Sequence, residues 1–256
     1  MKISTWNVNG IRAVHKKGYL LPYLEIEQPD VFCIQETKAE VEQLTSEIIN
    51  PLGYDSCFHS CRRKKGYSGV ATFSKVKPLN YFTEIGAERF DEEGRVVGAD
   101  FGEFVLLNVY FPNGGSGKER LDYKLDFYST FFEFCEKLRS EGKQLLICGD
   151  YNTAHYEIDL ARPKENVNTS GFMEIERKRL DELVQRGYAD VFRQFNQEPE
   201  QYTWWDQKTR ARDRNIGWRI DYHWATETLA QKARTCYIQP HVIGSDHCPV
   251  VIELDL

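Results

Sequence analysis

Short apolar runs alternate with amphipathic stretches along the whole chain, a pattern typical of proteins that contain both strands and helices. The clearest helical pattern spans residues 119–140, where Leu121, Leu125 and Tyr128 begin a series of apolar residues spaced three or four positions apart. The segment 104–109 is instead almost continuously apolar, which predicts a strand buried on both faces. We expect the helix to pack its apolar face on a sheet.

The same periodicities predict many short strands and few helices. Strands are expected at residues 2–7, 30–35, 54–59, 68–74, 95–101, 104–110, 144–149, 202–205, 218–224, 235–239 and 249–254, and helices at 18–28, 39–49, 119–140 and 173–186. No repeat, low-complexity segment or linker interrupts the pattern, so we expect one domain over residues 1–256. This balance of elements predicts an α/β sandwich, in which two packed sheets carry helices on their outer faces.

The composition indicates a soluble chain with a substantial core. Of the 256 residues, 41% are apolar. No apolar run reaches the roughly 18 residues of a membrane helix, and the first residues do not resemble a signal peptide. The 7 cysteines are odd in number, and Cys33 and Cys148 lie inside apolar runs, which favours a reducing compartment. We therefore expect a cytoplasmic protein without structural zinc or a membrane partner.

The charge balance argues against a protein that coats nucleic acid non-specifically. Lysine and arginine total 33 and aspartate and glutamate 39, a net charge of −6, whereas non-specific coating depends on many phosphate contacts. Local contact is still expected, because basic residues cluster at 62–65 and again at 208–219, where tryptophans are interleaved with them. The simpler interpretation of both clusters is a pair of solvated basic loops.

Polar side chains recur where the predicted strands meet loops. The set comprises Asn7, Asn9, Glu36, Tyr110, Asn113, Asp150, Asn152, Asp221, Asp246 and His247. Each residue alone has an ordinary explanation, because asparagine and aspartate form turns and a histidine is often a hydrogen-bonded structural residue. Turn formation does not require this mixture of groups, however, and side chains at strand ends can converge on one rim of a sheet. We therefore expect the set to form a site.

The carboxylates and amides of this set suit a magnesium-dependent reaction. Glu36 beside amide oxygens matches Mg²⁺, which prefers oxygen ligands and takes few carboxylates while it keeps waters and substrate phosphate. Asp150 and Asn152 lie two residues apart, so their side chains emerge on one side of an extended segment and could hold and deprotonate a water molecule.

The remaining groups suit negative charge that develops on phosphorus. His247 could donate to a phosphoryl oxygen if Asp221 fixes its tautomer, and Tyr110 adds another donor. The chain has no nucleophile elbow, phosphate loop, zinc-protease motif or dinucleotide fingerprint, which disfavours serine or cysteine hydrolysis and nucleotide binding. The set therefore predicts hydrolysis of a phosphodiester.

With these residues identified, the chain resembles the exonuclease III family of abasic-site endonucleases from Lys2 to Leu254. The motifs that carry the resemblance are TWNVNGIR at 5–12, IQETK at 34–38, GYSGV at 66–70, NVYFPN at 108–113, GDYNTAH at 149–155, GWRIDY at 217–222 and GSDHCP at 244–249. Their number and order make coincidence implausible.

The resemblance implies a four-layer α/β sandwich of the DNase I-like class, with two mixed, mainly antiparallel sheets. It implies Mg²⁺, with Mn²⁺ able to substitute, held by residues among Asn7, Asn9, Glu36, Asp150, Asn152 and Asp246. It implies catalytic roles for Tyr110, Asp150, Asn152, Asp221 and His247. Some relatives carry aspartate where Asn9 stands, so this chain lacks one carboxylate of their metal site.

The resemblance also implies a DNA substrate. The expected DNA-binding residues are Arg12, Lys17, Tyr67, Asn113, Asn166, Trp204 and Trp218. Of these, Trp204 and Trp218 match positions that line a pocket for a flipped-out baseless sugar, although core packing would also explain two tryptophans. The implied protein is a monomer, associated with the nucleoid while it acts on double-stranded DNA that contains abasic sites or blocked 3′ ends.

Two other functions remain open at this stage. The first keeps the catalytic groups but hydrolyses a soluble or lipid phosphoester, as other members of the same superfamily do; the tryptophans and basic loops disfavour it. The second is a non-catalytic DNA-binding module, which would have no use for Glu36, Asp150, Asp221 and His247 together.

Overall fold

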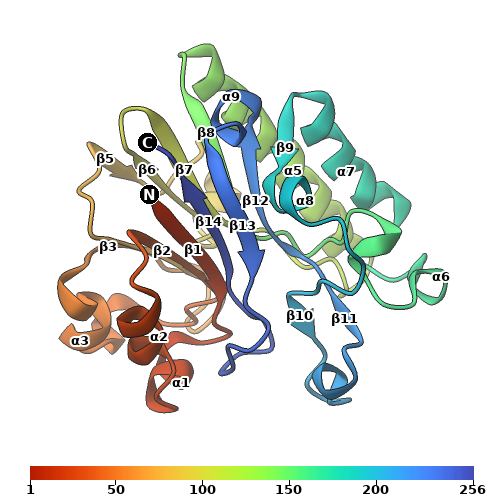
Figure 1. Ribbon diagram of the computed structural model, residues 1–256, viewed down its shortest axis with the longest axis horizontal. Helices are drawn as coiled ribbons and strands as arrows, with labels where there is room; N and C mark the ends of the chain where they lie inside the picture. The colour runs from red at the N-terminus through yellow and green to blue at the C-terminus, as the bar shows by residue number, and fades with distance from the viewer.

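The computed structural model describes residues 1–256 and contains two six-stranded sheets packed face to face (Figure 1). The first sheet has the order β13-β14-β1-β2-β4-β3, with β1 (Lys2–Asn7), β2 (Val31–Gln35), β3 (Asp55–His59), β4 (Val70–Ser74), β13 (Ala233–Ile238) and β14 (Val250–Leu254). The second has the order β5-β6-β7-β8-β12-β9, with β5 (Asn80–Phe82), β6 (Val96–Asp100), β7 (Phe104–Tyr110), β8 (Gln144–Asp150), β9 (Tyr188–Asp190) and β12 (Asp221–Thr226). A separate two-stranded ribbon pairs β10 (Trp204–Trp205) with β11 (Gly217–Trp218).

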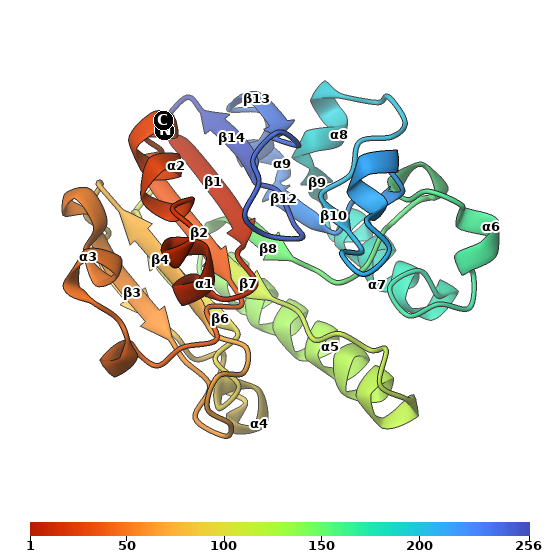
Figure 2. The ribbon, with the colours of Figure 1, turned by 90° about the horizontal axis from the view of Figure 1, so that it is seen from below.

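Helices cover the outer face of each sheet. The helices of the chain are α1 (Ile11–Lys16), α2 (Leu20–Glu27), α3 (Ser46–Ile49), α4 (Glu88–Asp91), α5 (Lys118–Ser140), α6 (Pro163–Asn166), α7 (Glu174–Gln185), α8 (Val191–Phe195) and α9 (Glu227–Ala230), of which α8 and α9 instead pack into the cluster between the sheets. Figures 1 and 2 show α1, α2 and α3 beside the first sheet, and α5 and α7 beside the second. No helix is long and apolar enough to cross a membrane.

Three hydrophobic clusters separate the layers. Between the sheets, Ile3 and Cys33 of the first sheet share a cluster with Leu106 and Leu146 of the second. The neighbouring residues of β7 point the other way, so Val105 and Leu107 join the cluster formed with α5 and α7. A third cluster packs α1 and α2 on the outer face of the first sheet. The predicted sandwich of two sheets with outer helices, and the strand buried on both faces, are therefore confirmed.

Each sheet is mixed, with one parallel strand pair among antiparallel ones. In the first sheet β1 runs parallel to β2, and in the second β7 runs parallel to β8. Parallel neighbours end at the same edge, so Asn7 lies beside Gln35 and Tyr110 beside Asp150. Antiparallel β12 begins at this edge, where Asp221 pairs with Asp150. This pairing brings polar strand ends from both sheets to one end of the sandwich.

Several predicted elements are wrong in detail. The helix predicted at 39–49 is only a short turn at Val41–Gln43 followed by α3, because Leu44 and Thr45 adopt extended backbone conformations between them. The strand predicted at 218–224 is split into β11 and β12. The helix α1 and the short strands β5 and β9 were not predicted, since their apolar patterns are too short to show a period.

Candidate active site

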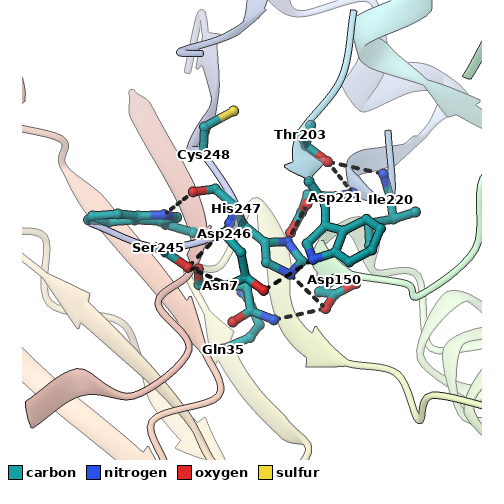
Figure 3. Close-up of polar contacts among 12 residues, drawn as sticks. Asn7, Gln35, Asp150, Thr203, Ile220, Asp221, Ser245, Asp246, His247 and Cys248 are labelled. Carbon is teal, nitrogen blue, oxygen red and sulfur yellow. Dashed lines mark hydrogen bonds and ion pairs between the residues drawn. The ribbon is translucent and has the colours of Figure 1, made fainter. Parts of the chain in front are cut away.

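A cluster of polar side chains occupies the end of the sandwich where β1, β2, β7 and β8 end. Glu36 directly follows β2 of the first sheet. Figure 3 shows the other members: Asn7 from the first sheet, Asp150 and Asp221 from the second, and His247 from the loop before β14. The side-chain nitrogen of Asn7 lies 3.0 Å from Glu36 Oε1 and 2.8 Å from Asp150 Oδ2, so one amide connects the carboxylates of the two sheets. Its oxygen instead accepts the backbone N–H of Asn9 at 2.9 Å. The amide of Asn7 thus presents donors, rather than an acceptor, to the carboxylates.

His247 is buried between two aspartates. Its Nδ1 lies 2.9 Å from Asp221 Oδ2, and its Nε2 lies 3.9 Å from Asp150 Oδ2 (Figure 3). Burial alone would lower the pKa of His247, but the charges of Asp221 and Asp150 outweigh it and raise the pKa to about 10. The ring is therefore an imidazolium at neutral pH, with Asp221 fixing one N–H and the other directed to the Asp150 side of the site.

Asp150 is the carboxylate whose proton affinity is raised most clearly. Burial and the negative charge of Asp221 raise its pKa to about 7, although His247 and the backbone N–H of Asn152 oppose the shift. That N–H donates to Asp150 Oδ1 at 2.8 Å. A carboxylate with a pKa near neutrality is suited to accept and release a proton.

Asn152 is fixed by its neighbours on both sides. Its side-chain nitrogen donates to Phe111 O at 2.9 Å, and its oxygen accepts from the side chain of Asn113 at 2.9 Å. Asn9, Glu36 and Asn152 all adopt the left-handed backbone region, with φ of 48°, 52° and 51°. This conformation is uncommon outside glycine and tends to occur where the surrounding structure holds a functional group in place.

A second group of polar side chains lies beside this cluster, around Asp246. Its Oδ1 accepts from the side chain of Asn9 at 2.8 Å and its Oδ2 accepts the indole N–H of Trp204 at 3.1 Å. Lys38 forms an ion pair with Glu36 at 2.6 Å and also donates to Asn9 Oδ1. Burial would raise the pKa of Glu36, but Lys38 and Asn7 outweigh it and lower the pKa, so Glu36 is ionised.

The donor set fits a hard divalent cation. Ligand atoms of Glu36, Asp150 and His247 all lie within 4.8 Å of one another. His247 is a poor ligand, because its ring is protonated and engaged with Asp221. The oxygens of Glu36 and Asp150, with nearby Asn9 and Asp246, are the kind of ligands that Mg²⁺ and Mn²⁺ take. An excess of carboxylates over cations at this edge also favours a bound cation.

A cavity of about 340 Å³ opens beside the cluster. Trp204 and Trp218 form one wall, where their rings meet edge to face with centroids 6.3 Å apart. The predicted site residues that line the cavity are Asn9, Glu36, Tyr110, Asn113, Asp150, Asn152, Trp204, Trp218, Asp246 and His247. Both tryptophans are half-buried in a small apolar cluster with Leu160 and Phe172, so they combine packing with an exposed ring face.

The other predicted residues lie outside the cavity. Asn7 and Asp221 are buried behind it, while Arg12 and Lys17 are exposed and Asn166 is half-buried, on or beside short helices. The hydroxyl of Tyr67 is held by Arg95 and Arg120 and does not line the cavity.

Lys38 and Thr203 are site residues that the sequence reasoning missed. Lys38 lies two residues after Glu36 in the motif quoted above, which is the one signal that could have identified it. Thr203 is buried, and its hydroxyl oxygen accepts the backbone N–H groups of Ile220 at 3.0 Å and Asp221 at 3.2 Å. No local pattern marks this threonine, because its partners lie 17 and 18 residues further along the chain.

Known proteins are similar to this chain in sequence and in fold. The family model described as the Endonuclease/Exonuclease/phosphatase family matches residues 4–247. An exodeoxyribonuclease of Bacillus subtilis is 41% identical over all of both chains, and the DNA repair nuclease APEX1 of Danio rerio is 40% identical over 99% of this chain and 82% of that protein. An AP endonuclease structure from Archaeoglobus fulgidus is 31% identical and covers all of both chains with a TM-score of 0.90.

These similarities extend over the whole chain and include the strand ends that build the cluster. A 3′-5′ exonuclease structure from Neisseria meningitidis, 26% identical, also covers all of both chains, with a TM-score of 0.92. The four-layer fold and the resemblance to abasic-site endonucleases that the motifs predicted are confirmed. The chain belongs to the Endonuclease/Exonuclease/phosphatase family.

Proposed function

We propose that this protein is a DNA repair nuclease that hydrolyses the phosphodiester 5′ to an abasic site in double-stranded DNA and leaves a 3′-hydroxyl. The observation that carries the proposal is the position of the Asp150–His247–Asp221 cluster beside a cavity walled by Trp204 and Trp218. A phosphoester hydrolase needs the first feature, and recognition of a baseless sugar needs the second. Relatives named as AP endonucleases and exodeoxyribonucleases support both parts.

The residues of the cluster divide the work of hydrolysis. Asp150 accepts the proton of the attacking water, since its pKa is raised to about 7, and Asn152 holds that water in line. His247 donates from Nε2 to a phosphoryl oxygen as negative charge develops there. Burial and the carboxylates of Glu36 and Asp150 raise the pKa of Tyr110 well above its usual value, so its hydroxyl remains a donor.

A divalent ion completes the site. Mg²⁺, for which Mn²⁺ could substitute, would be held by Glu36 with contributions from Asn9, Asp150 and Asp246, and would polarise a phosphoryl oxygen as a Lewis acid. Asn7 orients the carboxylates of Glu36 and Asp150 through its two donors.

The DNA is bound by residues around the rim. Trp204 and Trp218 enclose the extruded sugar, and an intact nucleotide is excluded because its base does not fit. Asn113 and Asn166 contact phosphate, while Arg12, Lys17 and Tyr67 contact the backbone and groove of the duplex. We further propose that the chain acts as a monomeric single domain, with 3′-phosphodiesterase and 3′ to 5′ exonuclease side activities and incision at damaged bases.

The test is a cleavage assay on four duplexes that contain an abasic analogue, a blocked 3′ end, a uracil or no lesion. We expect a nick on the 5′ side of the abasic analogue in Mg²⁺, and none in chelator. Turnover of a soluble phosphoester with no nicking of the abasic duplex would contradict the proposal and favour another branch of the family.

A further inference from the structure

Lys124 of α5 and Glu176 of α7 form an ion pair deep inside the protein, and neither has a place in the proposed chemistry. Lys124 Nζ lies 2.6 Å from Glu176 Oε1, and both side chains are 0% exposed. Removing two charges from water is costly, and replacement of such a pair by apolar residues often leaves stability unchanged or improves it. A buried ion pair is therefore better explained by the geometry it imposes than by the stability it adds.

The ammonium of Lys124 holds the segment that follows Asp150. It donates to the backbone oxygen of Asn152 at 2.7 Å, and Asn152 is one of the residues with a left-handed backbone. One helical turn further along α5, the hydroxyl of Tyr128 donates to the backbone oxygen of Tyr151 at 2.7 Å. One face of α5 thus fixes the carbonyls of the two residues that follow the proposed proton acceptor.

The carboxylate of Glu176 holds a neighbouring part of the cavity wall. It accepts the hydroxyl of Ser170 at 3.0 Å, the N–H of Gly171 at 2.7 Å and the N–H of Met173 at 3.2 Å. Ser170 and Gly171 line the cavity beside Trp218. The polar atoms around this carboxylate therefore belong to Lys124, to Ser170 and Gly171 of the cavity wall, and to Met173 just before α7.

Gly171 shows how closely the segment held by Glu176 packs against the segment held by Lys124. Its φ is +99°, and a Cβ at this position would lie 3.1 Å from the backbone oxygen of Asn152 and 3.2 Å from the ring of Trp218. The wall that Glu176 fixes thus touches both the residue that Lys124 fixes and the tryptophan that faces the sugar. The ion pair sets the gap between the reacting groups and the sugar pocket.

We propose that Lys124 and Glu176 are positioning residues that determine substrate specificity: they hold Asn152 at the reacting end and Ser170 and Gly171 at the pocket end in one fixed arrangement. This inference rests on the proposed function and extends it. When the pair is neutralised, the pocket loosens, so incision at abasic sites falls while removal of ordinary nucleotides from a 3′ end falls less. The ratio of the two activities therefore drops.

The decisive variant is the double substitution Lys124→Met with Glu176→Gln. Lys124→Met alone leaves an unpaired buried carboxylate and should be strongly destabilised. The double variant carries no charge at positions 124 and 176 and keeps a side-chain oxygen for Gly171 and Met173, so its unfolding midpoint should return close to that of the wild type. It still lacks the bond to Asn152.

We expect the double variant to lose on the order of 10- to 100-fold in kcat on the abasic duplex, the scale of a small misplacement of reacting groups, with KM changed by less than about 3-fold. The ratio of abasic incision to 3′ nucleotide removal should fall about 10-fold or more. Lys143→Met is the matched control, because it breaks the Lys143–Asp100 pair of 2.6 Å at the other end of β8. Both activities of this control should stay within about 3-fold of the wild type.

Recovery of wild-type kcat and activity ratio together with stability in the double variant would overturn the inference and leave the pair a purely structural role. If the double variant does not fold, Ser170→Ala decides, because it removes the bond between the cavity wall and Glu176 and leaves the ion pair intact. It should still lower the activity ratio, and an unchanged ratio would overturn the inference. A wild-type protein that fails to nick the abasic duplex would instead refute the proposed function. All rates are measured well below each variant's unfolding midpoint, as followed by circular dichroism.

Discussion

Two buried aspartates of this protein have opposite electrostatic environments. Asp150, in the proposed active site, is buried among carboxylates, and burial together with Asp221 raises its pKa to about 7. Asp159, behind Trp218, is equally buried, but Arg219 and Arg193 outweigh the effect of burial and lower its pKa. Burial alone therefore does not decide the state of a carboxylate; the balance of nearby charges does.

The two surroundings differ in how completely the charges are matched. Around Asp159, Arg219 Nε lies at 2.8 Å and Arg193 Nη2 at 2.6 Å, and Arg219 also pairs with Asp190 at 2.7 Å. Two aspartates there face two arginines. In the proposed active site the carboxylates of Glu36, Asp150, Asp221 and Asp246 share only His247 and Lys38. The first network suits a structural role, whereas the second leaves negative charge for a metal ion and a proton to neutralise.

The largest expected effect concerns catalysis. His247→Ala removes the cation that faces the phosphoryl group and should lower kcat on the abasic duplex by at least about 100-fold, while duplex binding is largely retained. Single-turnover rates and a binding titration measure the two separately. A rate within a few-fold of the wild type would remove His247 from the proposed mechanism.

The next effect concerns stability and separates the two networks. Asp159→Ala leaves Arg219 and Arg193 without their shared partner, so the free energy of unfolding should fall by about 3–5 kcal/mol. Urea denaturation measures this loss. An unchanged midpoint would show that the arginines find other partners and that the network of Asp159, Asp190, Arg193 and Arg219 does not stabilise the fold.

A smaller effect is expected from the metal. Because the active-site carboxylates outnumber their cations, Mg²⁺ at about 100 times its dissociation constant should stabilise the wild type by about 2.7 kcal/mol. Glu36→Gln should lose most of this gain, whereas Asp159→Ala should keep it. Thermal melts with and without Mg²⁺ test this, and equal stabilisation of the wild type and Glu36→Gln would place the ion elsewhere.

The smallest effect is on the pH dependence of stability without metal. The pKa of Asp150 is raised on folding, so its contribution is fully present below the unfolded pKa near 4 and is lost as pH rises through about 7. The pKa of Asp159 is lowered, so its contribution is present above the unfolded value and is lost only as pH falls through the lowered pKa. Between pH 5 and 8 the free energy of unfolding should therefore fall less for Asp150→Asn than for the wild type. Urea denaturation at several pH values measures this, and parallel plots of the free energy of unfolding against pH would contradict it.

The parts of the fold with long hydrophobic patterns could be predicted from the sequence. The helix predicted at 119–140 matches α5, Lys118–Ser140, because its apolar face repeats over many turns. The segment 39–49 also has spaced apolar residues, but extended backbone at Leu44 and Thr45 interrupts the helix. Local spacing could not reveal this interruption.

The site could be predicted where polar residues directly follow strands, as with Glu36 and Asp150. The residues that hold the site in place could not be predicted, because they depend on contacts between distant segments. Lys124 and Glu176 lie 52 residues apart in sequence, and each appears in an ordinary amphipathic helix. Only the packing of α5 against α7 brings them together and isolates them from water.

The most direct measurement compares Asp150→Asn with Asp159→Asn in single-turnover cleavage of the abasic duplex, at a temperature where both variants are folded. We predict a rate at least about 100-fold lower for Asp150→Asn and within about 3-fold of the wild type for Asp159→Asn. Equal losses in the two variants would contradict the assignment of proton transfer to Asp150.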